Sequence, residues 1–492
     1  MLLRKITWVA KLLCICFFAN AQQETLKLSL TEIITLAQSD APDVLIAETI
    51  LSNRYWQYQS FLADFKPQIQ LGTNSSLSRA IEPIILPNGS LAFVDRSLMQ
   101  NNLDVRLQQQ IGATGGTIFA TTGLSRIDIF NTGGSDISYL STPISIGFNQ
   151  PIFQVNLVKW DKKIRPLDYE IAEREYSEDM EQVAFETAGL FFRVLTAQLA
   201  LEAATKNKSD ADTLYSISKG RFGVGRIAET DLLRVELNVR SSEQALAAAT
   251  LGLQSATEEL RDFLGIKQAV KFELDAPYEI PKVNIDPEKA LEYARQNRST
   301  VINFERRLLE AERNVAVEKG NAGLNANINA SFGLSQTSDN LTDAYRNPLD
   351  QERVAVTLQV PIADWGKTKA RLETAKSNQE LTRRQVSQEK ISFEREILLK
   401  VQQLDLVRNQ VGLANRTYEV AKKTNNITRQ RYLVGKIGVT ELNIALGQEE
   451  TSRQAYVRAL QSFWTAYYEL RRLTLYDFIN DRPLIQEKTI NN

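Results

Sequence analysis

The chain has 492 residues, with 58 lysines and arginines against 59 aspartates and glutamates, and it contains no histidine. The near-neutral charge argues against binding to a polyanion such as a nucleic acid. The absence of histidine excludes serine–histidine–aspartate triads and typical zinc and copper sites. We therefore expect no enzyme, no catalytic residue, no metal site and no cofactor.

The first 21 residues are typical of a secretory signal peptide. Basic residues precede an apolar core at residues 12–18, and a small-x-small cleavage site ends at Ala21. Cleavage would remove Cys14 and Cys16, so the mature chain would begin at Gln22 without disulfides or thiolate chemistry. It would carry 55 basic and 59 acidic residues, a net charge of −4.

Alternating segments are the next feature along the chain. After residue 21 no apolar run is long enough to cross a bilayer as a helix, so we expect no membrane-spanning helix. Apolar residues instead alternate with polar or small ones, a pattern typical of strands with one apolar face. Each segment is about ten residues long, which allows a tilted strand to cross a bilayer. A soluble sandwich with a solvated face would show the same pattern. The expected strands lie at about 67–79, 137–150, 324–335 and 352–361.

The chain also contains an internal duplication. Residues 221–233 (RFGVGRIAETDLL) match residues 431–443 (RYLVGKIGVTELN) at an offset of 210. The same offset carries Pro151 onto Pro361, and each of these prolines directly follows an alternating segment. Because the motif and the prolines match at the same offset, the two halves are expected to share one order of elements.

The upstream parts of the halves match at a different offset. Residues 29–65 resemble residues 286–322 at an offset of 257, so the first half holds 47 extra residues within about 80–140. We expect a first repeat at 22–275, a second repeat at 276–480 and a C-terminal tail at 481–492.

The insertion leaves two interpretations open. Residues 103–107 alternate, residues 112–116 form a turn, and residues 117–125 again have the pattern of a strand. Residues 80–137 could thus add a hairpin to a barrel and bring each chain to six strands, or they could form a hairpin outside it. A large extracellular loop is the usual form of such an insertion, so we expect four strands per chain.

Two helical segments are unusually long. Residues 157–219 and 366–431 contain almost no glycine, and about 60 residues of helix extend for roughly 90 Å. We expect helical hairpins at about 157–265 and 366–475. Steps of three and four separate the apolar residues of two seams, as in a coiled coil. The seams are Ala188, Phe192, Leu195 and Leu199, and Ile397, Val401, Leu404, Val407, Val411, Ala414, Tyr418 and Ala421.

The duplicated motif falls where each long helix must reverse. Its glycine can adopt the left-handed conformation of the residue that ends a helix. Its threonine can cap the next helix, and its acid is favourably placed in the first turn of that helix. Capping alone would explain the glycine and the threonine. It would not require an acid in both copies or a basic residue four or five positions before it. The residues are Gly225, Arg226, Thr230 and Asp231 in the first copy and Gly435, Lys436, Thr440 and Glu441 in the second.

With residues 149–153 (NQPIF) and 359–362 (QVPI), these motifs and paired halves resemble the TolC-like outer-membrane efflux family over essentially the whole mature sequence. The resemblance implies an α+β membrane protein and a homotrimer. Each chain would give four strands, or six if the insertion joins the barrel, to a transmembrane β-barrel that continues into a long periplasmic α-helical barrel. Pro151 and Pro361 would mark the junction between the two.

The resemblance also implies a function. The protein would be the exit duct of a tripartite efflux or type I secretion system in a Gram-negative outer membrane. A periplasmic adaptor and an inner-membrane pump would open it. Asp231 and Glu441 fall where the family has acids at the periplasmic constriction, with Arg226 and Lys436 supporting the closed state. A second acid one turn after Glu441 is absent. The adaptor would dock at the tips, which carry Gly225, Gly435, Thr230 and Thr440.

Two other classes remain as alternatives. A secreted or surface coiled-coil protein with β decoration would explain the long seams but not the duplicated strands. A barrel enzyme such as a lipase is disfavoured by the missing histidine. The sequence does not identify the exported compound or the partner pump.

Overall fold

The computed structural model describes residues 24–131, 134–268, 270–434 and 436–485. The signal peptide and Gly435 lie outside the described residues. The chain forms two compact units. The helical unit comprises residues up to 50, 174–298 and from 393, and the sheet unit comprises Leu51–Glu173 and Ser299–Ser392. Each unit contains segments of both sequence halves, so these spatial units differ from the sequence repeats.

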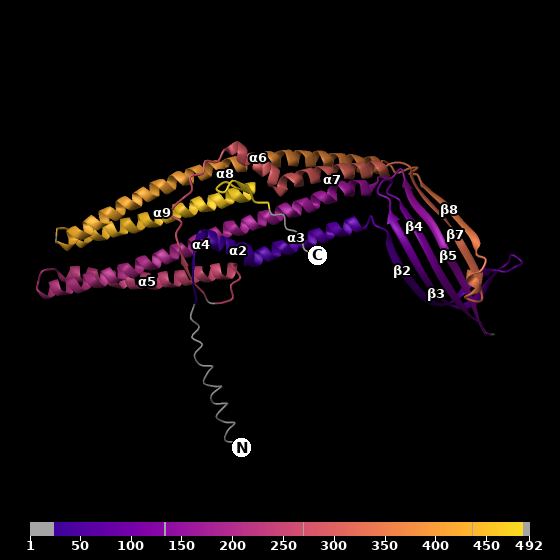
Figure 1. The fold of residues 1–492 in the computed structure, drawn as a ribbon, viewed down its shortest axis with the longest axis horizontal. Coiled ribbons are helices and arrows are strands. Elements are labelled where there is room, and N and C mark those ends of the chain that lie inside the picture. Colours follow the sequence, from indigo (N-terminus) through magenta and orange to yellow (C-terminus); the bar gives the residue numbers. More distant parts are fainter. Residues whose placement is uncertain (1–23, 132–133, 269, 435, 486–492) are drawn as a thin grey trace, which may run out of the picture. The chain divides into compact units, whose positions relative to one another are not determined.

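The sheet unit contains one antiparallel sheet in the order β2-β3-β4-β5-β7-β8 (Figure 1). A 3-10 helix, Asp343–Tyr345, lies between the last two strands. The strands are β2 Gln68–Ile85, β3 Leu91–Gln110, β4 Thr117–Asn131, β5 Gly134–Ile152, β7 Asn325–Ser338 and β8 Leu349–Gln359.

The expectation of four strands and a large loop is therefore wrong for this sheet. The insertion forms β3 and β4, which continue the sheet between β2 and β5. The loop between β2 and β3 spans only residues 86–90, and the loop between β3 and β4 spans 111–116. Gly89 and Gly115 adopt positive φ angles of 81° and 77° in these loops, which glycine does without steric cost. Short loops let nearly the whole insertion pair with its neighbours.

Four helical segments of the sheet unit join these strands. They are parts of α3 Pro42–Ala63, α4 Leu157–Gly223 and α8 Lys367–Leu433, together with α7 Ser299–Asn321. Side-chain contacts connect them in the order α3, α4, α7, α8. Tyr58 of α3 stacks on Tyr169 of α4 with ring centroids 5.3 Å apart. Arg313 and Asp161 pair at 3.6 Å between α7 and α4, and Arg307 and Glu389 pair at 2.5 Å between α7 and α8.

The helical unit is built from matching pairs of elements. The remaining parts of α4 and α8 continue into α5 Glu229–Phe263 and α9 Val439–Thr474. Strands β1 Glu24–Leu28 and β6 Val270–Leu274 pair in parallel, and β9 Tyr476–Asp477 pairs with β10 Arg482–Pro483. The short helices are α2 Leu30–Asp40 and α6 Pro287–Asn297.

The helix bounds reproduce the offsets of the duplication. Helices α2 and α6 begin and end at an offset of 257, and α4 and α8 begin and end at an offset of 210. Ser29 and Asp286, which also correspond at the offset of 257, are the N-caps of α2 and α6, and each accepts a backbone N–H with its side chain. Equivalent sequence signals therefore start equivalent helices.

The core of the helical unit lies along the two predicted seams. Ala188 and Phe192 of α4 and Ile397 and Val401 of α8 are at most 1% exposed. Burial of such apolar side chains is the main term that holds these helices together.

A charged cluster is buried beside this core. The Arg471 guanidinium donates two hydrogen bonds of 2.9 Å to the Glu181 carboxylate and lies 3.5 Å from an oxygen of Asp477. Tyr467 donates to Asp477 at 2.7 Å, and burial raises the pKa of the Tyr467 hydroxyl.

Within the described residues one helix meets the length and composition of a membrane span, which differs from the expectation for the mature sequence. It is α4, in which an 18-residue window has a mean hydropathy of 1.2 and is 44% buried. The helical unit buries much of the apolar surface of α4, because Ala184, Ala188, Phe191 and Phe192 are all 0% exposed. The packing of α4 in this unit accounts for its apolar composition.

Candidate functional site

One face of the sheet carries a continuous band of apolar side chains, here called the apolar belt. Directly paired residues share a face, so the strand register defines the belt. Many of its side chains are exposed, from 39% at Leu107 to 73% at Ile69. From β2 to β8 the belt comprises Ile69, Leu71, Leu103, Val105, Leu107, Ile118, Ala120, Leu124, Ile144, Ile146, Phe148, Ile328, Phe332, Leu334, Val354, Val356 and Leu358.

The opposite face of the same strands is polar. Its side chains are mostly amides, hydroxyls and charged groups, and Phe119 is an apolar exception that lies 5.1 Å below the Arg106 guanidinium. The face includes Gln68, Gln70, Asn74, Asp104, Arg106, Gln108, Thr121, Ser125, Ser145, Asn149, Asn327, Asn329, Ser331, Thr357 and Gln359.

This division of the faces separates two interpretations of the strands. A soluble sandwich buries its apolar face against a second sheet, whereas the belt is largely exposed in the described part of the chain. An apolar band that faces outward over a polar inner face is typical of strands in a membrane barrel. The strand lengths of 11–20 residues are sufficient to cross a bilayer.

The two predicted junction prolines lie where strands lead into helices. Pro151 lies near the end of β5, opposite Asn327, and Pro361 lies just after β8. The chain then takes left-handed residues in both places, at Phe153 (φ 67°) and at Trp365 (φ 53°). Each junction thus contains a left-handed residue between a strand and a long helix.

The two duplicated motifs lie at the tips of the hairpins α4–α5 and α8–α9. In the first tip Gly225 has a φ of 70°, and the Arg226 N–H donates to the Arg221 carbonyl at 2.9 Å. In the second tip the Lys436 N–H donates to the Arg431 carbonyl, also at 2.9 Å. The two hydrogen bonds join equivalent residues, so both long helices end at the same place in the motif.

The threonines of the motif do not act as predicted. Thr230 and Thr440 are the second residues of α5 and α9, and the N-caps are Ala228 and Gly438. The Gly438 N–H donates to the Glu441 carboxylate at 3.1 Å. The expectation that capping does not require the acid is therefore wrong for Glu441, because this side chain satisfies an N–H at the helix start.

The charged side chains of the tips are exposed. Arg226 and Asp231 in the first tip and Lys436 and Glu441 in the second all face solvent. Neither basic residue forms an ion pair within the described part of this chain. Between the hairpins, Arg429 of α8 pairs with Asp210 of α4 at 3.3 Å.

Each tip also exposes an apolar residue that the sequence reasoning missed. Val224 is 70% exposed and Val434 is 69% exposed. The two valines occupy the same place in the two copies of the motif, directly before its glycine, so their equivalent positions were the available signal. An exposed apolar residue therefore recurs at equivalent places in the two tips.

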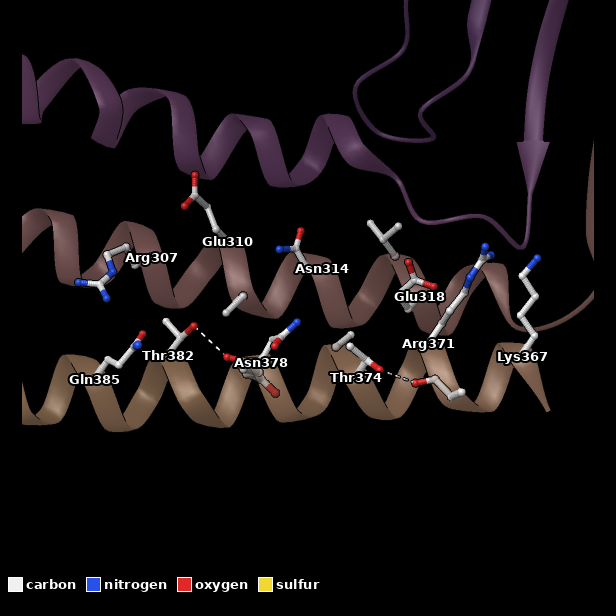
Figure 2. Close-up of a pocket in the computed structure, with 15 residues that line it drawn as sticks. Arg307, Glu310, Asn314, Glu318, Lys367, Arg371, Thr374, Asn378, Thr382 and Gln385 are labelled. Atoms are coloured by element: carbon white, nitrogen blue, oxygen red, sulfur yellow. Dashed lines mark hydrogen bonds between the residues drawn. The ribbon is translucent and has the colours of Figure 1, made fainter.

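A polar groove of about 1000 Å³ lies between α7 and α8 in the sheet unit. Figure 2 shows Glu310 and Asn314 of α7 along one side and Asn378 and Thr382 of α8 along the other. Alanines such as Ala311 lie between the polar residues. Across the described residues, no cluster of three acidic side chains is placed to hold a metal ion.

Comparison with known proteins defines the class as an outer-membrane efflux channel. The family model for the outer membrane efflux protein matches residues 100–266 and 290–474, which is more than half of the chain. The chain belongs to the outer membrane efflux protein family. This confirms the resemblance to TolC-like channels, and the two matched segments lie in the two halves of the duplication.

Solved structures share the fold at low sequence identity. The CmeC outer membrane channel of Campylobacter jejuni has a TM-score of 0.65 and 13% identity, over 93% of this chain and 87% of that chain. A membrane protein from Pseudomonas aeruginosa has a TM-score of 0.67 and 13% identity, over 90% and 92%. The open state of the MtrE outer membrane channel of Neisseria gonorrhoeae has a TM-score of 0.63 and 14% identity, over 90% and 88%. No curated protein matches the sequence significantly.

Proposed function

We propose that the protein is the outer-membrane exit duct of a tripartite efflux or type I secretion system. It is a passive conduit that a periplasmic adaptor and an inner-membrane pump open. The observation that carries this proposal is the sheet with an apolar belt on one face and a polar opposite face, continued by long helices at both junctions. The belt contacts lipid and the polar face lines a water-filled lumen, so transport needs no catalysis or cofactor.

The working form in this proposal is a homotrimer. A single sheet leaves strands β2 and β8 with unpaired edges, which a membrane does not tolerate. Helix α8 also carries an exposed apolar stripe with a seven-residue spacing, as at a coiled-coil contact. The stripe comprises Leu399, Leu406, Leu413, Val420 and Ile427, each more than 50% exposed. Neighbouring copies would cover both the edges and this stripe.

The expected location is the outer membrane of a Gram-negative cell, with the helices in the periplasm and the signal peptide cleaved after Ala21. Membrane fractionation followed by native mass measurement tests this location and the trimer together. We expect the mature chain in the outer-membrane fraction at three times its monomer mass. Recovery in the soluble periplasm, or a mass that stays at monomer or dimer, would contradict the proposal.

The constriction in this proposal lies at the tips, where the adaptor also docks. Glu441 lines the narrowest ring, Asp231 adds charge nearby, and Arg226 and Lys436 support the closed arrangement across neighbouring copies. Carboxylates that converge on one axis repel by roughly 1 kcal/mol per pair at 4 Å in water, and by more where water is excluded. The exposed Val224 and Val434 supply apolar contacts for the docked adaptor.

Replacing Glu441 with glutamine tests the ring. Glutamine keeps an acceptor for the Gly438 N–H while it removes the charge, so the start of α9 is preserved. In planar bilayers we expect weaker cation preference and weaker block by multivalent cations, with trimer assembly unchanged.

Charge reversal tests the supporting residues. We expect Lys436→Glu or Arg226→Glu to raise the resting conductance, because each weakens the closed arrangement. If the Glu441→Gln channel and both reversal channels conduct and select like the parent, the assignment of these residues is wrong while the duct itself stands.

A further inference from the structure

The two strands of the insertion carry the same apolar belt as the other four. One row of directly paired residues crosses β2, β3, β4, β5 and β7 on a single face. It consists of Ile69, Leu107, Ala120, Ile146 and Phe332. A hairpin that stood in water outside the membrane would have no reason to continue the apolar side chains at this level. β3 and β4 therefore belong to the wall that crosses the membrane.

The number of strands suits closure with identical copies. All neighbouring strands of the sheet are antiparallel, so the first and last of six, β2 and β8, run in opposite directions. The β8 edge of one copy can thus pair antiparallel with the β2 edge of the next. An odd number of strands would force parallel contacts between the copies. Residues along β8 are exposed throughout, which leaves this edge available.

The width of the six strands also matches the helices that they join. Four helical segments in one layer, at roughly 9 Å per helix, occupy about 36 Å. Six strands spaced about 4.8 Å apart and tilted by about 40° occupy roughly 38 Å along the circumference, whereas four would occupy only about 25 Å. A six-stranded contribution therefore continues the helical layer without a change of circumference.

We propose that three copies close an 18-stranded barrel, in which β8 of each copy pairs with β2 of the next. This inference rests on the proposed duct and specifies its outer end. A barrel of 16–18 strands encloses an aqueous channel. With a circumference matched to the helical tunnel, the barrel adds no size selection of its own. Solutes that pass the tips leave through a pore as wide as the tunnel.

Single cysteines test the membrane position of β3 and β4, because the mature sequence contains no cysteine of its own. In trimers embedded in lipid vesicles, Val105→Cys and Ala120→Cys would lie on the belt, as would Leu71→Cys of β2. Arg106→Cys is the matched control on the polar face. With a charged maleimide we expect the three belt cysteines to react at least about tenfold more slowly than the control.

The outcomes separate this inference from the proposed duct. If Val105→Cys and Ala120→Cys react like the control while Leu71→Cys stays protected, the hairpin lies outside the membrane and the 18-stranded barrel is wrong. If Leu71→Cys also reacts fast, or no trimer forms in membranes, the duct itself fails.

Disulfide crosslinking tests the edge contact directly. Leu71→Cys is combined in turn with Val354→Cys, Val356→Cys and Leu358→Cys. The three pairs sample different registers of β8 against β2 of the next copy. At least one pair should give a covalent ladder that ends at the trimer. The control pair Leu71→Cys and Val105→Cys joins neighbours within one chain and should give no covalent oligomer. Absence of a ladder from all three edge pairs, with the control pair oxidised, would overturn the β2–β8 contact.

Discussion

Replacing Arg471 with leucine is expected to destabilise the helical unit by about 3–5 kcal/mol, the usual cost of removing one partner of a buried ion pair. The Arg471 side chain is 13% exposed, and those of Glu181 and Asp477 are 4% and 2% exposed. Removal of the guanidinium leaves both carboxylates buried without their cation. The loss of helical circular dichroism on heating measures the effect, and we expect a fall of several degrees in the melting temperature.

The matched control is Arg384→Leu. Arg384 pairs with Glu380 within α8, but the two side chains are 78% and 53% exposed. Such a pair contributes about 0–1 kcal/mol, so this variant should melt close to the parent. A double variant, Glu181→Met with Arg471→Met, should recover part of the loss, because it also removes one of the two carboxylates that Arg471→Leu leaves buried without a cation. If Arg471→Leu costs no more than Arg384→Leu, the cluster does not stabilise the unit.

The loss of stability in Arg471→Leu should depend on pH in a defined direction. Burial already raises the pKa of the Glu181 carboxyl, and Arg471 opposes that shift. Without the arginine the pKa in the folded state rises further above its unfolded value. An acid with a raised folded pKa stabilises most at low pH and loses this contribution as the pH rises through that pKa. The deficit of Arg471→Leu relative to the parent should therefore be smaller at about pH 5 than at about pH 8.

Placing a charge on the apolar belt should block assembly in the membrane. Leu71 is 71% exposed on the belt face of β2, and Gln70 beside it belongs to the polar face. Arginine on the lipid face of a barrel costs about 2–4 kcal/mol near the bilayer midplane. This cost recurs in every copy of a trimer. We expect Leu71→Arg to reduce folding into lipid vesicles strongly, while Gln70→Arg folds like the parent.

The shift in electrophoretic mobility between folded and heat-unfolded barrels measures this difference. Equal folding of the two variants would show that the Leu71 face does not contact lipid. A loss of folding in both variants would show that β2 tolerates no charge at all, which contradicts a polar lumen on the Gln70 side.

The sequence predicted the repeated parts of this fold well because their signals are local. The duplicated landmarks at offsets of 210 and 257 correspond to helices whose bounds differ by the same numbers. The seam residues Ile397 and Val401 are buried, as three- and four-residue spacing implies. The apolar side chains of the four expected strand segments form one face of the sheet, because alternation alone specifies which residues share a face.

The parts that the sequence missed depend on distant partners or on permissive residues. Only parts of β3 and β4 show a clear alternation of apolar and polar residues. Their place between β2 and β5 follows from backbone pairing along the strands. The N-caps Ala228 and Gly438 are not typical capping residues, so the nearby threonines attracted the prediction. The pair of Glu181 and Arg471 joins residues 290 positions apart, and no local pattern indicates it.

The hydrogen bond from Gly438 to Glu441 determines how a charge at the tip can move. A carboxylate on a flexible side chain can usually swing away from an approaching ion or from a like charge. Here the carboxylate is held against the backbone at the first turn of α9, so its position follows that of the helix start. In the constriction proposed above, dilation of the ring of Glu441 carboxylates would therefore require displacement of the helices themselves. This would couple the electric field at the proposed entrance to the mechanical state of the hairpins.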